Sequence, residues 1–205
     1  MNEFDNKAAF WDQNPMHLER SKAVAKQITE RIPVNTEMKA LEYGAGTGLT
    51  SFILKPRLKE IIMMDNSREM VKIMEEKIKS TGSDNLKAIY HDLEQEDYNG
   101  GCFDLIITQM VLHHITSTDD IIGRFNSLLR SGGYLAIADL KIEDGTYHKD
   151  DFTGHKGFDI NELSDLIARG GFTDISVRDC FTITKEITAG NARQYEVFLM
   201  IAQKK

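Results

Sequence analysis

Three glycines stand at alternate positions in the segment LEYGAGTGLT, residues 41–50, directly after an apolar run. Glycine weakens strands and helices, because it has the most backbone freedom to lose and no side chain to pack. Three of them at the end of a strand predict a turn where a ligand or a helix passes close to the backbone. A helix that starts at the carboxyl end of a first parallel strand is also where open α/β sheets bind nucleotides.

Two acidic residues follow later apolar runs and could bind the sugar and base of such a ligand. Asp65 ends the run EIIMMD, and Asp92 follows LKAIYH. A carboxylate accepts hydrogen bonds, which suits the two hydroxyls of a ribose or the amine of an adenine. The structural alternatives are a first-turn acid of the next helix for Asp65 and an ordinary loop acid for Asp92.

The glycine spacing separates two kinds of nucleotide ligand. A dinucleotide fingerprint G-x-G-x-x-G would place its third glycine at position 49, where this chain has Leu49. A ligand without a pyrophosphate needs no such cradle and only has to pass over Gly44 and Gly46. S-adenosylmethionine is a ligand of this kind.

Four histidines are candidates for acid–base chemistry. His113 and His114 follow the run FDLIITQM, and His148 and His155 lie in the polar segment 141–157. Histidine titrates near neutral pH and can take a proton from an acceptor group. One histidine of the adjacent pair is expected to pack inward. The sequence does not decide whether this histidine is His113. The four fit no recognised metal-ligand spacing, so no metal is expected.

Apolar runs alternate with helical patterns and must position these residues. Strands are predicted at 38–44, 60–65, 86–92, 103–110 and 134–140, with helices ending near Pro56, starting after Ser67, and at 119–133 and 158–172. This alternation indicates βαβ units and a mostly parallel sheet covered on both faces. Two β-rich segments at 174–184 and 193–202 are joined too closely for a helical crossover, so they should pair antiparallel.

Size and charge exclude several classes of protein. The chain has 205 residues, which suits a single domain over 1–205, and a formal net charge of −7, which argues against broad binding to nucleic acid or an anionic membrane. The polar, acidic N-terminus does not resemble a signal peptide, and two cysteines indicate no disulfide framework. A cytoplasmic protein, monomer or homodimer, is expected.

Several motifs in order carry a family resemblance. LEYGAGTG, MMDNSREM, HDLEQ, FDLIITQMVLHHI and LLRSGGYLAIADL follow one another along the chain. In these motifs the chain resembles a class I S-adenosylmethionine-dependent methyltransferase, similar to the small-molecule enzymes of ubiquinone and menaquinone biosynthesis. The resemblance implies an α/β Rossmann-like three-layer sandwich, with a mostly parallel seven-stranded sheet, an antiparallel last strand and helices on both faces.

The resemblance also implies which residues bind the cofactor. Asp65 would hold the ribose and Asp92 the adenine amine, while Glu42 would orient the glycine loop or the methionine ammonium. The full set of expected contacts is Glu42, Gly44, Ala45, Gly46, Asp65, Asn66, Met70, Asp92, Leu93 and Gln109.

The acceptor side is predicted around an N-terminal cover, residues 1–35, and a lid loop, residues 141–157. His114 and His148 are the catalytic candidates, and Trp11, His113 and His155 are expected to line the substrate or lid. The expected activity is transfer of a methyl group to a small-molecule acceptor by in-line displacement. The alternatives are a cofactor-binding regulatory protein without catalysis and, less favoured by Leu49, an NAD(P)-dependent oxidoreductase.

Overall fold

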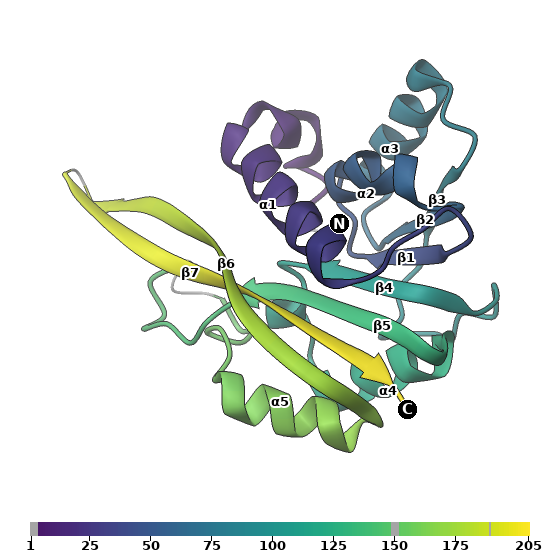
Figure 1. Cartoon of the computed structure of the whole chain (residues 1–205). Coiled ribbons are helices and arrows are strands. Elements are labelled where there is room, and N and C mark those ends of the chain that lie inside the picture. Colours follow the sequence, from purple (N-terminus) through teal and green to yellow (C-terminus); the bar gives the residue numbers. More distant parts are fainter. Residues whose placement is uncertain (1–3, 149–151, 189) are drawn as a thin grey trace.

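A seven-stranded sheet forms the centre of the protein, and Figure 1 shows helices on both of its faces. The computed structural model describes residues 4–148, 152–188 and 190–205. The strands are β1 (Lys39–Tyr43), β2 (Glu60–Asp65), β3 (Leu86–Tyr90), β4 (Phe103–Gln109), β5 (Leu129–Leu140), β6 (Phe172–Thr188) and β7 (Asn191–Lys204). The helices are η1 (Ala8–Gln13), α1 (Pro15–Arg31), α2 (Leu49–Leu54), η2 (Lys55–Arg57), α3 (Arg68–Thr81), η3 (Leu112–His114), α4 (Thr118–Leu128) and α5 (Ile160–Arg169).

The strand order is β3-β2-β1-β4-β5-β7-β6. Strands β1 to β5 pair in parallel, and β7 runs antiparallel to both β5 and β6. The predicted Rossmann-like α/β sandwich with an antiparallel last strand is therefore confirmed. The chain reverses its direction of winding between β1 and β4, and such a switch point is where open α/β sheets bind ligands.

The core lies in two layers, one on each face of the sheet. On one face α1, α2 and α3 bury side chains such as Ile28, Leu54 and Met74 against the strands. On the other face α4 and α5 bury Phe125 and Ile167. The central parallel strands are buried on both faces, which explains why they appear in the sequence as unbroken apolar runs.

Local capping signals place the starts of α3 and α5 as predicted. The Ser67 hydroxyl accepts a hydrogen bond from the Met70 amide at the start of α3, and Asp159 caps α5 through two backbone amides. One boundary is wrong. The segment 129–133 was expected to end the helix before β5, but it is the first part of β5, because Leu129 is buried and pairs with Phe103.

Within the described residues, no helix is both long and apolar enough to cross a lipid bilayer.

Candidate functional site

One cleft of about 1120 Å³ opens at the carboxyl ends of β1, β2 and β4. The glycine loop after β1 and the end of β2 line one part, and η3 with the loop after β5 lines another. Single small-molecule pockets typically occupy about 300–1,000 Å³. This cleft is therefore large enough for a nucleoside-sized ligand and a second small molecule beside it.

The glycine loop is held by backbone hydrogen bonds to the neighbouring strand. The amides of Gly44 and Ala45 both donate to the carbonyl of Met64, at 2.8 and 3.0 Å. Gly46 has a φ of 57°, in the left-handed region, and a side chain added there would come 3.7 Å from the indole nitrogen of Trp11. Glycine at this position thus permits both the turn and the close approach of the N-terminal segment.

Two buried carboxylates, Asp65 and Glu42, support this loop. Asp65 accepts hydrogen bonds from the amides of Gly46 at 2.7 Å and Ser67 at 2.8 Å. Burial raises the pKa of Asp65 to about 6, although these amide donors act in the opposite direction. Burial likewise raises the pKa of Glu42 to about 7, although its carboxylate is hydrogen-bonded by the amide and hydroxyl of Ser51. The loop is therefore built around groups that titrate near neutral pH.

Eight of the ten residues predicted to bind the cofactor line the cleft: Glu42, Gly44, Ala45, Gly46, Asp65, Asn66, Met70 and Gln109. The other two, Asp92 and Leu93, are not among the lining residues. Asp92 instead contacts a residue that lines the cleft, since it accepts a hydrogen bond from the side-chain amide of Asn66 at 3.2 Å. Leu93 is 1% exposed and packs in the core.

The N-terminal segment before β1 lies against the glycine loop and α3. Trp11 lines the cleft over Gly46, and the neighbouring Asp12 accepts a hydrogen bond from the hydroxyl of Thr47. Asp12 also forms an ion pair with Lys77 of α3 at 2.9 Å. These contacts join η1 to the glycine loop and to α3.

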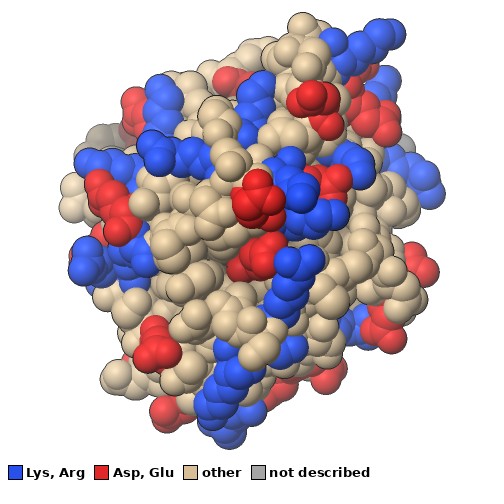
Figure 2. Space-filling model, turned by 45° about the vertical axis from the view of Figure 1, so that its right-hand side comes forward, with Lys and Arg blue, Asp and Glu red and all other residues tan. Residues whose placement is uncertain are grey.

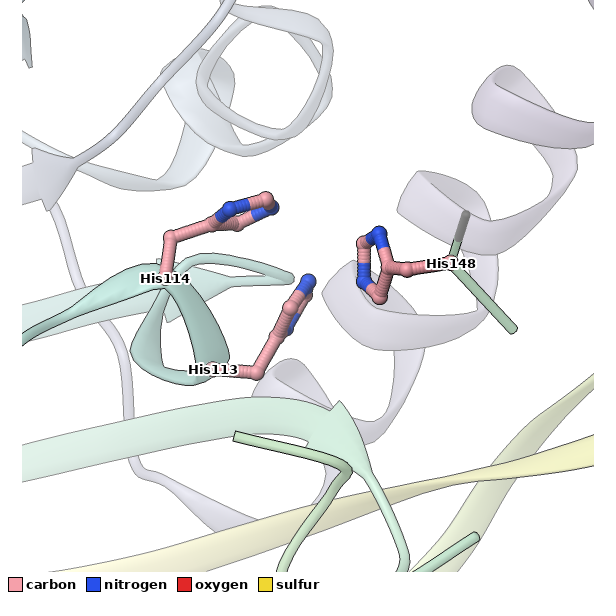
Figure 3. Close-up of side chains that lie close together, drawn as sticks. All are labelled: His113, His114 and His148. Carbon is pink, nitrogen blue, oxygen red and sulfur yellow. The ribbon is translucent and has the colours of Figure 1, made fainter. Parts of the chain in front are cut away.

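Three of the four candidate histidines meet at the other side of the cleft. His113 is 1% exposed, and its Nδ1 lies 2.6 Å from a carboxylate oxygen of the fully buried Asp139. The rings of His114 and His148 stand 4.2 and 5.0 Å from the ring of His113, measured between centroids. Of the adjacent pair it is thus His113 that packs inward, and Figure 3 shows all three rings turned toward one another.

The loop after β5 is tied to η3, which explains how His148 reaches the histidine pair. The amide of His155 donates to the carbonyl of His113 at 2.8 Å, and the His155 ring lies 3.0 Å from the carbonyl of Ile115. A side chain added to Gly154 would come 2.3 Å from the same His113 carbonyl. The close contact therefore depends on a glycine.

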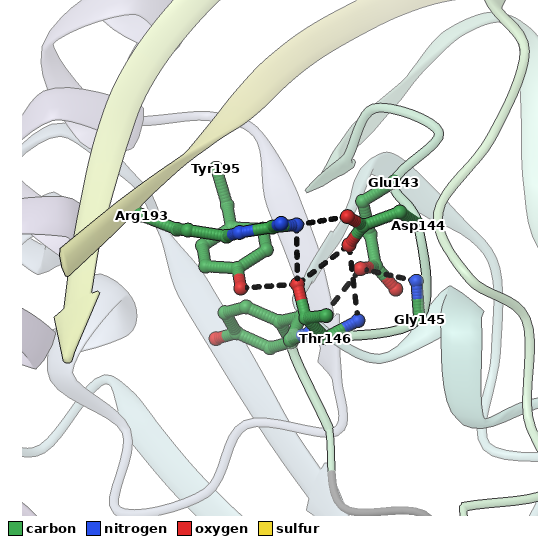
Figure 4. A network of polar contacts seen from close by, with 7 residues as sticks. Glu143, Asp144, Gly145, Thr146, Arg193 and Tyr195 are labelled. Atoms are coloured by element: carbon green, nitrogen blue, oxygen red, sulfur yellow. Dashed lines mark hydrogen bonds and ion pairs between the residues drawn. The ribbon is translucent and has the colours of Figure 1, made fainter. Parts of the chain in front are cut away.

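The other end of this loop is anchored to the β6–β7 hairpin. Arg193 pairs with Asp144, and the Thr146 hydroxyl lies 2.7 Å from that of Tyr195 (Figure 4). Glu143 accepts hydrogen bonds from two amides within the loop. The described parts of the predicted lid, 141–148 and 152–157, are thus held at both ends, and residues 149–151 lie outside the described structure.

Arg20 is a cleft residue that the sequence analysis missed. It lines the cleft although it is only 4% exposed, and burial lowers its pKa. Its Nη1 contacts the sulfur of Met16 at 3.5 Å, while its buried Nε has no hydrogen-bond partner in the described part of the chain. The sequence does contain a sign that Arg20 is buried. Arg20 lies four and eight positions before Val24 and Ile28, on the same apolar face of α1.

The strand order and the cleft at the carboxyl ends of the strands define a Rossmann-like α/β protein. Residues 35–171 match the model of a family described as methyltransferase domain. This match covers more than half of the chain, and the chain therefore belongs to that methyltransferase family.

Individual relatives agree with this assignment. An uncharacterised methyltransferase of Schizosaccharomyces pombe is 30% identical over 151 residues, which are 70% of this chain and 51% of the relative. The chain thus spans about half the length of that relative.

Solved structures show the same fold. The YcgJ protein of Bacillus subtilis superposes with a TM-score of 0.73 at 14% identity, covering 90% of this chain and 98% of that one. A phosphoethanolamine N-methyltransferase of Haemonchus contortus, solved with S-adenosyl-L-methionine, has a TM-score of 0.71 at 15% identity, covering 100% of this chain and 60% of that one.

Proposed function

We propose that the protein transfers the methyl group of S-adenosylmethionine to a small-molecule acceptor. The observation that carries this proposal is the arrangement of the cleft, in which the glycine loop and Asp65 face one part and a histidine cluster faces another. Membership of the methyltransferase family supports the reaction type. The residues present also fit the cofactor, because the loop turns on glycines and the carboxyl group of Asp65 lines the cleft beside it.

In the cofactor half, each charged or polar group of the ligand has a counterpart. Asp65 would accept the ribose hydroxyls, and the carbonyls of Gly44 and Gln109 would accept the methionine ammonium. We assign the methionine carboxylate to Arg20, since a buried guanidinium with an unpaired Nε is a strong receptor for a carboxylate. The bound cofactor supplies an activated methyl group on a positively charged sulfur.

In the acceptor half, the protein has to align the acceptor and exclude water. Methyl transfer is an in-line displacement that disperses the charge on sulfur, so proximity and orientation supply much of the rate enhancement. His114 and His148 line this half. Either side chain would accept the proton that the acceptor group loses. Trp11 and Phe152 add aromatic walls to the same cleft.

A small molecule is the partner that the surface supports. On the face shown in Figure 2, lysine and arginine side chains are interspersed with aspartate and glutamate, and the whole chain carries a net charge of −7. Nucleic-acid binding requires a continuous basic surface, because its affinity comes mainly from phosphate contacts. We therefore place the acceptor among small molecules and include neither nucleic acid nor membrane in the proposal.

The test separates binding from turnover. Titration calorimetry should show one S-adenosylmethionine bound per chain and no binding of NAD(H) or NADP(H). Gly46→Val should abolish this binding in a folded protein, because its side chain would fill the space between the loop and Trp11. An acceptor panel scored by S-adenosylhomocysteine formation then tests catalysis. Cofactor binding without turnover on any acceptor would favour the regulatory alternative.

His114→Ala and His148→Ala test the acceptor half. Each should lower turnover much more than cofactor affinity, since the two side chains lie away from the glycine loop. Full turnover by both variants would remove the histidine cluster from the chemistry while leaving the cofactor assignment intact.

A further inference from the structure

The three clustered histidines have the composition and spacing of a metal site, although their separation in the sequence fits no ligand pattern. One ring nitrogen from each of His113, His114 and His148 lies within 4.8 Å of the other two. Two of the rings come from η3 and the third from the loop after β5, and Figure 3 shows them converging. We propose that these three histidines bind one divalent transition-metal cation of the zinc type.

Asp139 prepares His113 for this role. One oxygen of Asp139 lies 2.6 Å from Nδ1 of His113, and the other accepts a hydrogen bond from the His113 amide at 3.3 Å. While this contact is kept, Nε2 is the nitrogen that His113 can offer to a metal. Metal-binding histidines generally hold such a carboxylate or carbonyl partner on the second ring nitrogen, which fixes the tautomer and raises the basicity of the ligand.

Asp139 is fixed in place behind His113. Its side chain is fully buried, and the oxygen that contacts Nδ1 of His113 also accepts a hydrogen bond from the Leu140 amide at 2.7 Å. A carboxylate held in this way fixes the orientation of the His113 ring.

The distances allow a metal after small rotations of the side chains. Zinc–nitrogen bonds of about 2.0–2.1 Å in a tetrahedral site place the ligand nitrogens about 3.3 Å apart. Since the ring nitrogens lie within 4.8 Å of one another, each pair would have to approach by at most about 1.5 Å. Rotation about the two side-chain torsions of a histidine moves its ring nitrogens by such a distance.

The ligand set determines which cation is expected. Imidazole nitrogens suit Zn²⁺, Cu²⁺ and Ni²⁺, whereas Mg²⁺ and Ca²⁺ prefer oxygen ligands. Three protein ligands with a fourth position open are typical of zinc sites that bind water or substrate. All three histidines line the cleft, so the fourth ligand would come from the contents of the cleft.

This geometry gives the site a consequence for methyl transfer, which rests on the proposed function. With a cation bound, His114 and His148 act as its ligands, and the cation takes over their role in removing the acceptor's proton. A hydroxyl or thiol of the acceptor at the open position would lose its proton to water more readily, because the cation lowers its pKa. The freed electron pair would form the bond to the methyl carbon, while the carbon–sulfur bond of the cofactor breaks and its electrons stay on sulfur.

The experiment uses the full-length chain, stripped with a chelator and then titrated with Zn²⁺ alone. Calorimetry and equilibrium dialysis should give one Zn²⁺ per chain, and Co²⁺ should give the visible absorption of a tetrahedral nitrogen site. His114→Ala and His148→Ala should each weaken Zn²⁺ binding at least tenfold. Asp139→Asn should weaken it about 10- to 100-fold, as expected for a residue that positions a ligand.

His91→Ala is the matched control, because its ring contacts Tyr98 and Glu96 and not the cluster. It should leave Zn²⁺ affinity unchanged. No Zn²⁺ bound to the parent protein, or equal affinity in the parent and the two cluster variants, would overturn the proposal. S-adenosylmethionine binding to the metal-free protein is measured separately, so a failed metal site is distinguished from a failed cofactor assignment.

Discussion

Replacement of the buried Glu42 by glutamine should change how the stability of the protein depends on pH. Glu42 lies at the end of β1 and is 3% exposed, and its carboxylate accepts a hydrogen bond from the amide of Ser51 at 3.1 Å. Burial is the largest influence on its pKa and, with the nearby charge of Asp65, raises it from 4.5 to about 7. The folded protein therefore holds this proton more tightly than the unfolded chain does.

The sign and size of the effect follow from this difference. A carboxyl group with a raised pKa contributes stability that is fully present below pH 4.5 and is lost as the pH rises through about 7. The gap between the two values, at about 1.4 kcal/mol per pH unit, corresponds to about 3 kcal/mol of unfolding free energy. Glutamine stays uncharged at every pH, and its carbonyl oxygen can still accept from Ser51. Glu42→Gln should therefore exceed the parent by only about 1 kcal/mol at pH 5 and by about 3 kcal/mol above pH 8.

Urea unfolding followed by circular dichroism between pH 5 and 8, without cofactor, measures this effect. For a chain of this size the gain corresponds to a rise in melting temperature of about 6–12 °C. Glu75→Gln, at an exposed position of α3, is the matched control and should follow the parent at every pH. Parallel stability profiles for the parent and Glu42→Gln would refute the reasoning.

Three further predictions concern the cleft. Asp65→Ala should weaken S-adenosylmethionine binding more than tenfold, because each lost charged hydrogen bond contributes about 1.5–3 kcal/mol. Unchanged binding by folded Asp65→Ala would remove this residue from the site. The affinity of the parent protein should also fall below pH 6, as Asp65 is protonated. Arg20→Met should weaken binding of S-adenosylhomocysteine at least tenfold but leave that of its decarboxylated analogue unchanged, and equal losses for both ligands, measured by calorimetry, would contradict the carboxylate assignment. Gly154→Ala should lower turnover at least tenfold with cofactor affinity within twofold, because the new methyl group would meet the His113 carbonyl at 2.3 Å; normal turnover would show that the loop can shift without harm.

The order of elements and the glycine loop that lines one half of the cleft could be predicted from the sequence, because both depend on neighbouring residues. Apolar runs identified the parallel strands, and the caps at Ser67 and Asp159 marked the starts of α3 and α5 through hydrogen bonds within a few residues. The glycines after β1 similarly report a local backbone requirement. The end of β1 and the glycine turn that follows it lie within one short stretch of the chain. This turn could therefore be predicted from a local pattern.

The arrangement of the histidines in the other half of the cleft was decided only by the tertiary structure. His148 lies 34 positions after His114 and reaches it because the loop after β5 binds the carbonyl of His113. Asp139 became the partner of His113 through the pairing of β4 with β5, which brings the ends of these strands together. The burial of Arg20 likewise depends on where α1 packs. Contacts of this kind join segments distant in sequence, and their partners are chosen by the packing of the whole chain and not by any local pattern.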